Sequence, residues 1–314
     1  MLKYIAVAAM AASALASAAP APAQNRADDR AQAEDIIVTG RRSGVPMWTV
    51  RSDRTTLVLV GAIHGVSKTT HWDPAALTDA LRKADRVMFP ESQAFTASPF
   101  RVIGWLAKWN AMGSLPKGVS LGGIAGPEAM RRLAALRARS MVRADYDRRH
   151  PLHLAGDLRD RAKGDIDYGR TAADYVRKAI KEHKLNSVPI RRSKARPLVK
   201  DLFASTPEEH VPCLQAAIAM AEAGPAAVQA RSDAWAARRV PEVIASPADK
   251  VYEICWPATE VGQPSSELTE EMKLLLSEPD VTVAVLHLRS LAASGGILDG
   301  LEAAGFDIQG PAWK

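Results

Sequence analysis

The sequence predicts an α/β fold in which a central mixed sheet is built from the N- and C-terminal segments and the middle is mostly helical. Two apolar, β-branched runs, residues 56–64 and 281–287, are typical of buried strands, and each ends in a histidine. A third short run, residues 84–91, ends in a glutamate. Because both ends of the chain supply strands, we expect a single domain over residues 47–314.

The first residues have the pattern of a secretory signal peptide. Lys3 precedes an apolar, alanine-rich stretch, and Ala21-Pro22-Ala23 supplies a small-residue cleavage site, so residues 1–23 are predicted to be removed. Residues 24–46 are polar and predict a flexible leader. Polar residues, a glycine and a proline interrupt the later apolar stretch 213–230. We therefore expect a periplasmic or secreted protein with no transmembrane segment in the mature chain.

The net charge of the chain indicates which classes of partner its surface attracts. The chain has a net charge of +6, and the basic surplus gathers in residues 131–149 and 191–196. Such surfaces attract acidic polysaccharide, phospholipid headgroups or nucleic acid. Only 5% of the residues are aromatic, so the stacking surfaces that single strands require are scarce. We predict no nucleic-acid partner and interpret the basic surface as a solvated face.

Cys213 and Cys255 are the only cysteines in the sequence. An exported chain passes through a compartment that permits disulfides, so the two residues either pair or remain free thiols. They are too few for a structural zinc site.

The expected elements follow from residue 47 onward. Residues 47–51 alternate apolar and polar side chains and form a hairpin with the first histidine strand. A helix over 74–83, capped by Asp73, connects that strand to the one ending at residue 91, which makes a βαβ unit. The later helices are expected over 100–112, 126–141, 168–183, 206–223, 228–239, 265–277 and 295–305, with a loop-rich stretch over 246–263 and a short last strand at 306–308.

His64, Glu91 and His287 end three of the predicted strands. In open α/β sheets the ligand crevice lies outside the carboxyl ends of the strands, so the three side chains are expected to converge there. Imidazole and carboxylate groups bind first-row divalent metals, and three such ligands leave positions open for water and substrate. The residues have no spacing signature, however, so the histidines could equally bond to the backbone and Glu91 could pair with Arg231.

Two further histidine motifs lie outside the predicted strands. His71 lies in the loop after His64 and could add a ligand or a proton carrier. Residues 150–153 form an H-x-x-H, but the proline inside it favours a solvated turn. The sequence contains no Walker motif and no dinucleotide-binding glycine loop, which makes nucleotide chemistry improbable.

Three groups of residues resemble the TraB/GumN family, whose hallmark is a repeated G-x-x-H motif. The first group is the strand ending in Gly61-Ala62-Ile63-His64, followed by Trp72-Asp73-Pro74, a helix and Glu91. The second, residues 283–311, looks like the closing segment of the family. The third, Arg231-Ser232-Asp233-Ala234-Trp235-Ala236, is similar to the family's R-N-x-x-W helix.

The resemblance covers about residues 47 to 314 and departs from the family pattern at two places. Ala284 stands where the second G-x-x-H has its glycine, and Ser232 stands where asparagine is usual. The resemblance implies an α/β fold like that of the erythromycin-esterase and ChaN-like relatives. Some relatives, the Tiki group, are metal-dependent peptidases, and the bacterial GumN branch is associated with exopolysaccharide loci.

The leading hypothesis from this resemblance is an exported metal-dependent hydrolase, of peptidase type, that acts on a peptide or polysaccharide. His64, Glu91 and His287 would bind a divalent metal (Mn, Co or Zn) or carry protons, and Arg231 would orient Glu91 or a substrate carboxylate. The alternative is a non-catalytic envelope protein that binds a polysaccharide, a peptide or haem. The sequence does not define an oligomeric state.

Overall fold

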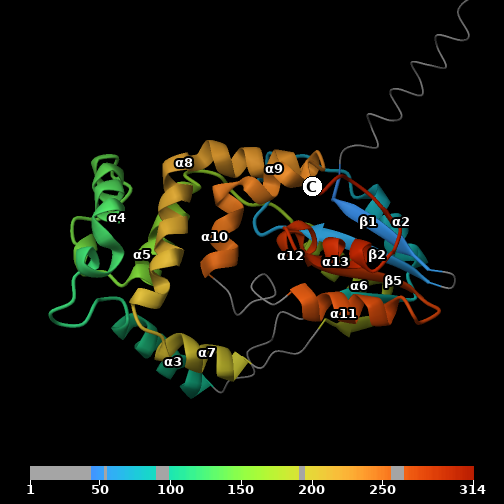
Figure 1. Cartoon of the computed structure of the whole chain (residues 1–314), viewed down its shortest axis with the longest axis horizontal. Helices are drawn as coiled ribbons and strands as arrows, with labels where there is room; N and C mark the ends of the chain where they lie inside the picture. The colour runs from blue at the N-terminus through green and yellow to red at the C-terminus, as the bar shows by residue number, and fades with distance from the viewer. Residues whose placement is uncertain (1–43, 53–54, 90–98, 191–194, 256–264) are drawn as a thin grey trace, which may run out of the picture. The chain divides into compact units, whose positions relative to one another are not determined.

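A computed structural model describes residues 44–52, 55–89, 99–190, 195–255 and 265–314. The expected signal peptide and nearly all of the expected leader lie outside these ranges. The described residues contain a six-stranded mixed sheet in the order β4-β3-β5-β2-β1-β6. The strands are β1 (Met47–Arg51), β2 (Thr56–Ala62), β3 (Arg86–Phe89), β4 (Ser187–Pro189), β5 (Val281–His287) and β6 (Ile308–Gln309) (Figure 1). Strands from both ends of the chain build the sheet, as the sequence predicted.

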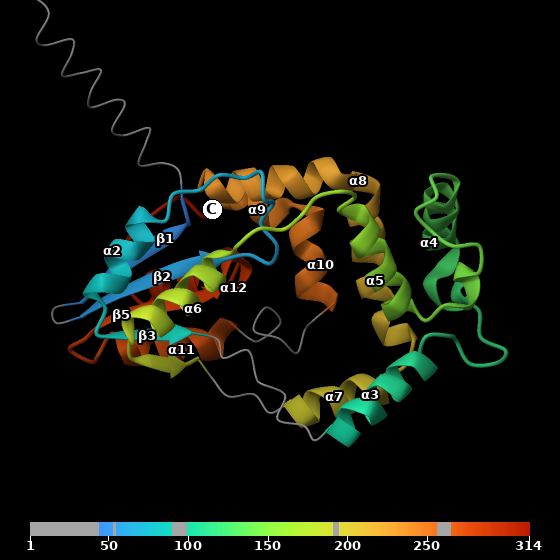
Figure 2. The same cartoon turned by 180° about the vertical axis from the view of Figure 1, so that it is seen from behind.

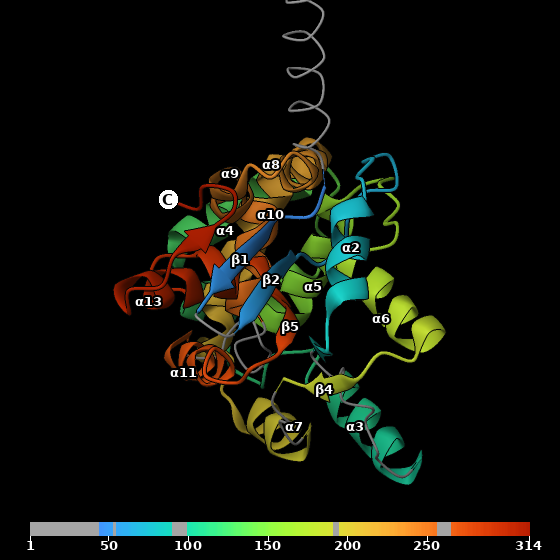
Figure 3. The same ribbon diagram turned by 90° about the vertical axis from the view of Figure 1, so that its right-hand side faces the viewer.

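Strands β2 and β5 lie side by side and are parallel along their whole length. Their pairing runs from Thr56 opposite Val281 to Ala62 opposite His287. Six of the seven residues in each strand are buried, as expected for apolar runs covered on both faces. Parallel pairing brings the carboxyl ends of the two strands together, although they come from opposite ends of the sequence (Figure 3).

The predicted hairpin and βαβ unit are both present. Strand β1 pairs antiparallel with β2, and the segment from β2 through α2 (Ala75–Lys83) leads to β3. Strand β5 lies between β2 and β3 in the sheet. The helix begins one residue later than predicted, because Pro74 occupies the cap position. The Asp73 carboxylate still accepts the backbone N–H of Ala75 at 2.9 Å.

Gly61 is required by close packing near the end of β2. A Cβ at this position would lie 2.5 Å from Cδ1 of Leu288 and 3.2 Å from the ring of Trp48. The backbone of Gly61 is also held on both sides: its N–H donates to the Pro46 carbonyl at 2.9 Å, and its carbonyl accepts Nε1–H of Trp235 at 2.8 Å. The first G-x-x-H glycine therefore fixes the path of the strand that leads to His64.

The middle of the chain is mostly helical, as predicted, although several helix ends differ from the predicted positions (Figure 2). The remaining helices are α3 (Pro99–Ala111), α4 (Leu121–Ala138), α5 (Pro151–Ala162), α6 (Ala172–His183), α7 (Ala195–Ala204), α8 (Val211–Ala236), α9 (Val240–Ala245), α10 (Pro247–Cys255), α11 (Ser265–Leu275), α12 (Leu288–Ala292) and α13 (Ile297–Ala303), with short 3-10 turns at Tyr146–Arg148 and Glu208–His210.

Buried apolar side chains form two clusters, and α8 contributes to both. One cluster surrounds the sheet and includes Trp235; the other lies among α4, α5, α8 and α10 and includes Leu214. The sequence predicted two helices here, and α8 does consist of two helical segments: the backbone is not helical at Gly224, where φ is 69° and a proline follows. Arg231 lies on the segment of α8 between the two clusters.

Helix α8 with its preceding turn, Glu208–Ala236, is the one described helix that is long and apolar enough to cross a membrane by length and composition. Polar residues, a glycine and a proline interrupt its apolar stretch, as the sequence predicted, and the backbone is not helical at Gly224. Half of its apolar window is buried inside the protein, where it packs against α5 and α10. Packing in the helical cluster therefore accounts for its hydropathy.

The stretch predicted to be loop-rich, residues 246–263, instead contains helix α10; residues 256–263 lie outside the described part of the chain. The prediction failed because a charged residue occupies a core position. Asp249 is fully buried beside Ala248 and Val251. An aspartate at such a position interrupts the apolar period by which helices are recognised.

The prediction of a solvated turn over residues 150–153 is also wrong. The proline is the first residue of α5, where its fixed φ suits the helix and its missing N–H has no intrahelical partner to lose. His150 is 2% exposed, and its Nδ1 accepts the N–H of Leu152 at 3.2 Å. Its ring centroid lies 5.3 Å from that of His210 and 6.2 Å from that of His153.

This histidine cluster should make the fold sensitive to acid. Burial, reinforced by His210 and His153, lowers the pKa of His150 from 6.5 to about 4. Burial also lowers the pKa of His153 and of His210. Between about pH 6.5 and pH 4 the folded protein thus binds fewer protons than the unfolded chain, so the free energy of unfolding decreases as the pH falls through this window.

We expect the Tm of the wild type to fall between about pH 7 and pH 5, and His150→Asn to reduce that fall. Asparagine keeps an oxygen that can cap α5 but does not titrate. His183→Asn, at the exposed end of α6, is the matched control and should keep the wild-type slope. Thermal unfolding followed by circular dichroism over this pH range provides the measurement. Equal slopes for the wild type and His150→Asn would refute the role of this cluster.

Candidate functional site

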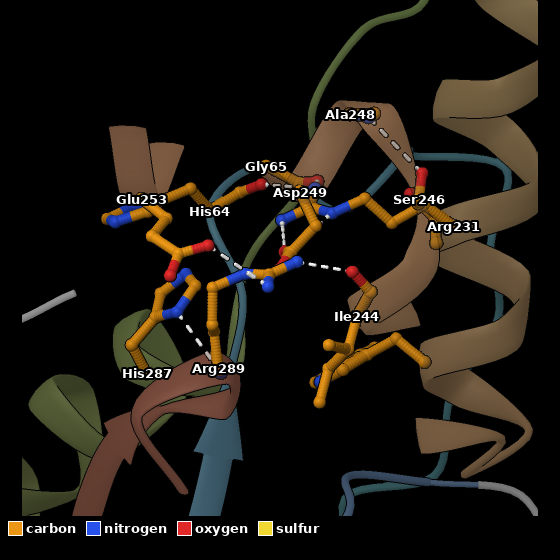
Figure 4. A network of polar contacts seen from close by, with 12 residues as sticks. His64, Gly65, Arg231, Ile244, Ser246, Ala248, Asp249, Glu253, His287 and Arg289 are labelled. Atoms are coloured by element: carbon orange, nitrogen blue, oxygen red, sulfur yellow. Dashed lines mark hydrogen bonds and ion pairs between the residues drawn. The ribbon is translucent and has the colours of Figure 1, made fainter. Parts of the chain in front are cut away.

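His64 and His287 lie next to each other at the carboxyl ends of β2 and β5. Ala62 is opposite His287 in the strand pair, and His64 follows two residues later. The centroids of the two imidazole rings are 5.0 Å apart (Figure 4). The structure thus brings together two of the predicted site residues, while their chemical roles stay predictions.

The two histidines differ in exposure. His64 is exposed, and its ring also lies 4.9 Å from the ring of Tyr252, so aromatic rings flank it from two residues. His287 is 5% exposed and caps α12, with its Nδ1 accepting the N–H of Arg289 at 3.3 Å. The imidazole of His64 can therefore contact solvent or a ligand, whereas the buried imidazole of His287 packs against it.

The pKa values of both imidazoles are lowered, which favours their neutral forms at neutral pH. Desolvation of the His64 ring, followed by the positive charge of Arg231, lowers the pKa of His64, and Asp249 opposes this effect. Burial lowers the pKa of His287 to about 3, again against the opposing charge of Asp249. A neutral imidazole has one nitrogen lone pair, which can accept a proton or bind a metal.

Arg231 is buried and binds groups of the protein itself. Its Nε and Nη2 donate to Oδ1 of Asp249 at 3.0 and 2.8 Å, and its Nη1 donates to the carbonyl oxygen of His64 at 2.7 Å. The sequence had suggested Glu91 or a substrate carboxylate as its partner. Among the described residues Arg231 instead binds Asp249 and orients the backbone at His64.

Asp249, Arg289 and Glu253 complete the polar network, and the sequence analysis missed all three. Arg289 donates from Nε to Oδ2 of Asp249 at 3.0 Å, and its Nη1 lies 3.1 Å from Oε2 of Glu253. Burial acts to raise the pKa of Asp249, but the positive charges of Arg231 and Arg289 outweigh it and hold the pKa below its usual value. A buried carboxylate therefore lies between two buried guanidinium groups, in its charged form.

The missed residues have a recognisable spacing once α10 is known to be a helix. Asp249, Tyr252 and Glu253 are related as i, i+3 and i+4, which places them on one helix face. Arg289 follows His287 by two residues in the first turn of α12. A correct prediction of α10 would have identified these side chains as candidate site residues.

The other candidates are placed as follows. Glu91 lies outside the described residues, so its predicted convergence with the histidines stays a prediction. His71 is exposed in the loop before α2. Ala284 is fully buried in β5, paired with Leu59 on one side and Met88 on the other. Its methyl group, the departure from the second G-x-x-H, is therefore accommodated in the core of the sheet.

A divalent metal fits this donor set poorly. The Nδ1 of His287 accepts a backbone N–H, so the proton of its neutral imidazole belongs on Nε2, and Nε2 then has no lone pair for a metal. Among the described residues, no group of three histidine, cysteine or acidic side chains is arranged to hold a metal ion. The two described histidines therefore do not fit a shared metal in this arrangement.

The geometry defines an α/β protein with a pair of neutral histidines at the carboxyl ends of adjacent parallel strands, supported by a buried Arg–Asp–Arg bridge. Residues 46–310 match the model of the TraB/PrgY/gumN family, and the chain belongs to this family. No curated protein and no solved structure matches the chain.

Proposed function

We propose that the chain is an exported hydrolase that cleaves peptide-like carbonyl bonds and uses His64 as its general base. The observation that carries this proposal is the exposed, neutral imidazole of His64, packed against the rings of His287 and Tyr252 at the carboxyl end of the sheet. A positioned base whose lone pair is available at neutral pH is what water activation requires.

In this proposal His64 accepts a proton from water as the water attacks a substrate carbonyl, and it returns this proton to the leaving amine as the carbon–nitrogen bond breaks. Arg231 holds the main-chain carbonyl of His64, which limits the reorganisation needed before reaction. His287 is neutral and therefore does not repel the positive charge that His64 acquires. Asp249 favours that charge, because its carboxylate acts to raise the pKa of His64.

Export and substrate class rest on separate observations. The signal-like residues 1–23 favour export, and the disulfide between Cys213 and Cys255 supports an oxidising compartment such as the periplasm. The peptide-like substrate comes from the resemblance to the Tiki group of peptidases. The predicted dependence on Mn, Co or Zn is kept as an arm of the test, and no step of the mechanism depends on it.

The purified protein, with its disulfide intact, should be incubated with a defined peptide mixture, and the products should be identified by mass spectrometry. We expect cleavage by the wild type, and a loss of about 100-fold or more in His64→Ala because its general base is removed. His183→Ala, an exposed histidine at the end of α6, is the control and should keep wild-type activity. Each protein is assayed with a chelator and with added Mn, Co or Zn.

Two outcomes would contradict the proposal. Full activity in His64→Ala would remove His64 from the mechanism. No cleavage by the wild type under any metal condition would favour the alternative, a non-catalytic envelope protein that binds a polysaccharide, a peptide or haem. Activity that requires an added metal and survives in His287→Gln would support a metal held by His64 with other ligands.

A further inference from the structure

We infer that Asp249 is the positioning residue of the histidine pair: it sets the placement of His64 and His287 by binding the two arginines that hold them. The inference rests on the proposed function in one respect, because the proposed function assigns both histidines to a single site. It adds a residue on α10, a helix that contributes no predicted site residue.

The carboxylate of Asp249 divides its two oxygens between two arginines. Oδ1 accepts hydrogen bonds from Nε and Nη2 of Arg231, and Oδ2 accepts one from Nε of Arg289 (Figure 4). The side chains of these residues are between 0% and 6% exposed, so water does not replace these contacts. Charge-assisted hydrogen bonds of this kind are directional and fix both guanidinium planes.

Each arginine in turn holds one histidine segment. Arg231 donates from Nη1 to the carbonyl of His64 at 2.7 Å and to that of Gly65 at 3.4 Å. Arg289 donates its own backbone N–H to Nδ1 of His287 at 3.3 Å. A shift of Asp249 would therefore be transmitted through the Arg231 side chain to the main chain at His64, and through the Arg289 side chain to the first turn of α12, whose backbone N–H binds the imidazole of His287.

Helix α10 gives Asp249 an anchor that is independent of both histidine strands. The helix packs against α8 and α9, and Cys255 at its end forms a disulfide with Cys213 of α8. Asp249 is thus fixed by the helical cluster, while its two arginines reach the sheet. The bridge joins the two clusters of the fold at the histidine pair.

Stability alone does not explain this arrangement well. Burying charged groups carries a desolvation cost, and well-packed apolar residues of similar volume often stabilise a protein as much or more. What an ion bridge adds is fixed direction and distance. In this protein the bridge fixes the positions of His64, which is the proposed general base, and of His287, which packs against it.

The test is Asp249→Asn, which keeps the shape of the side chain but replaces one acceptor oxygen with a donor that cannot bind an arginine. We expect the imidazole NMR signals of both His64 and His287 to shift, and kcat to fall about 100-fold while KM changes little. Glu222→Gln, on α8, is the matched control: it weakens a surface contact with Arg132 and should leave signals and kinetics unchanged.

Arg231→Lys is the second variant, in case Asp249→Asn does not fold. Lysine keeps the positive charge opposite Asp249 but cannot bind both its carboxylate and the His64 carbonyl as the planar guanidinium does. If either Asp249→Asn or Arg231→Lys folds and its imidazole signals do not shift, the inference is overturned. Absence of hydrolysis in the wild type would refute the proposed function, and the NMR result would still decide the role of Asp249.

Discussion

Replacing Arg231 with alanine is expected to lower the free energy of unfolding by about 3–5 kcal/mol, because it leaves a buried charge without its main partner. The side chains of Arg231 and Asp249 are 1% and 0% exposed. Arg289 would remain on one oxygen of Asp249, but the other oxygen would lose two hydrogen bonds. The His64 carbonyl would lose its donor as well.

Urea denaturation at neutral pH gives the comparison, with Arg132→Ala as the control. Arg132 pairs with Glu222 at 2.7 Å, but both side chains are partly exposed, at 29% and 39%. Its loss should cost only about 0–1 kcal/mol. If the two variants had equal free energies of unfolding, the buried bridge would contribute no more to stability than the surface pair does.

Removing the disulfide is expected to lower the free energy of unfolding by about 3–4 kcal/mol in the chain-entropy model, because the bond closes a long loop. Cys213 and Cys255 are separated by 42 residues and join α8 to the end of α10. The double variant Cys213→Ala/Cys255→Ala should therefore unfold at a lower temperature. It should also loosen the helix that carries Asp249.

Thermal unfolding with and without dithiothreitol measures this effect in the wild type. The double variant is its own control, since dithiothreitol should not change its Tm further. Two free thiols in the denatured, non-reduced wild type would show that the bond is absent. An unchanged Tm on reduction would show that it contributes little to stability.

The sheet could be predicted from the sequence because its strands have a simple local signal. The apolar runs of β2 and β5 are buried on both faces, so nearly every residue is apolar and each run is recognised by its length and its β-branched residues. The convergence of their carboxyl ends was inferred from fold-level rules rather than from the residues themselves. Helix boundaries were less accurate: the helix predicted to begin at residue 206 begins at Val211, because a separate 3-10 turn, Glu208–His210, precedes it.

The candidate site could be predicted only in part. His64 and His287 were identifiable because each follows directly from a strand. Asp249 was not, since a buried aspartate has the same sequence signature as a solvated loop residue until its arginine partners are known. Those partners come from α8 and α12, and such long-range pairings leave no pattern in the local sequence. The site thus depends on tertiary contacts that no single stretch of the chain encodes.

The most direct test of whether His64 and His287 form one site is a nuclear Overhauser effect between their imidazole protons. Protein with proton-bearing histidines in a deuterated background provides the spectrum, and His64→Gln and His287→Gln assign the two signals. With ring centroids 5.0 Å apart, a cross peak between the two rings is expected. If both signals are assigned, the protein is folded and no cross peak appears, His64 and His287 do not form one site.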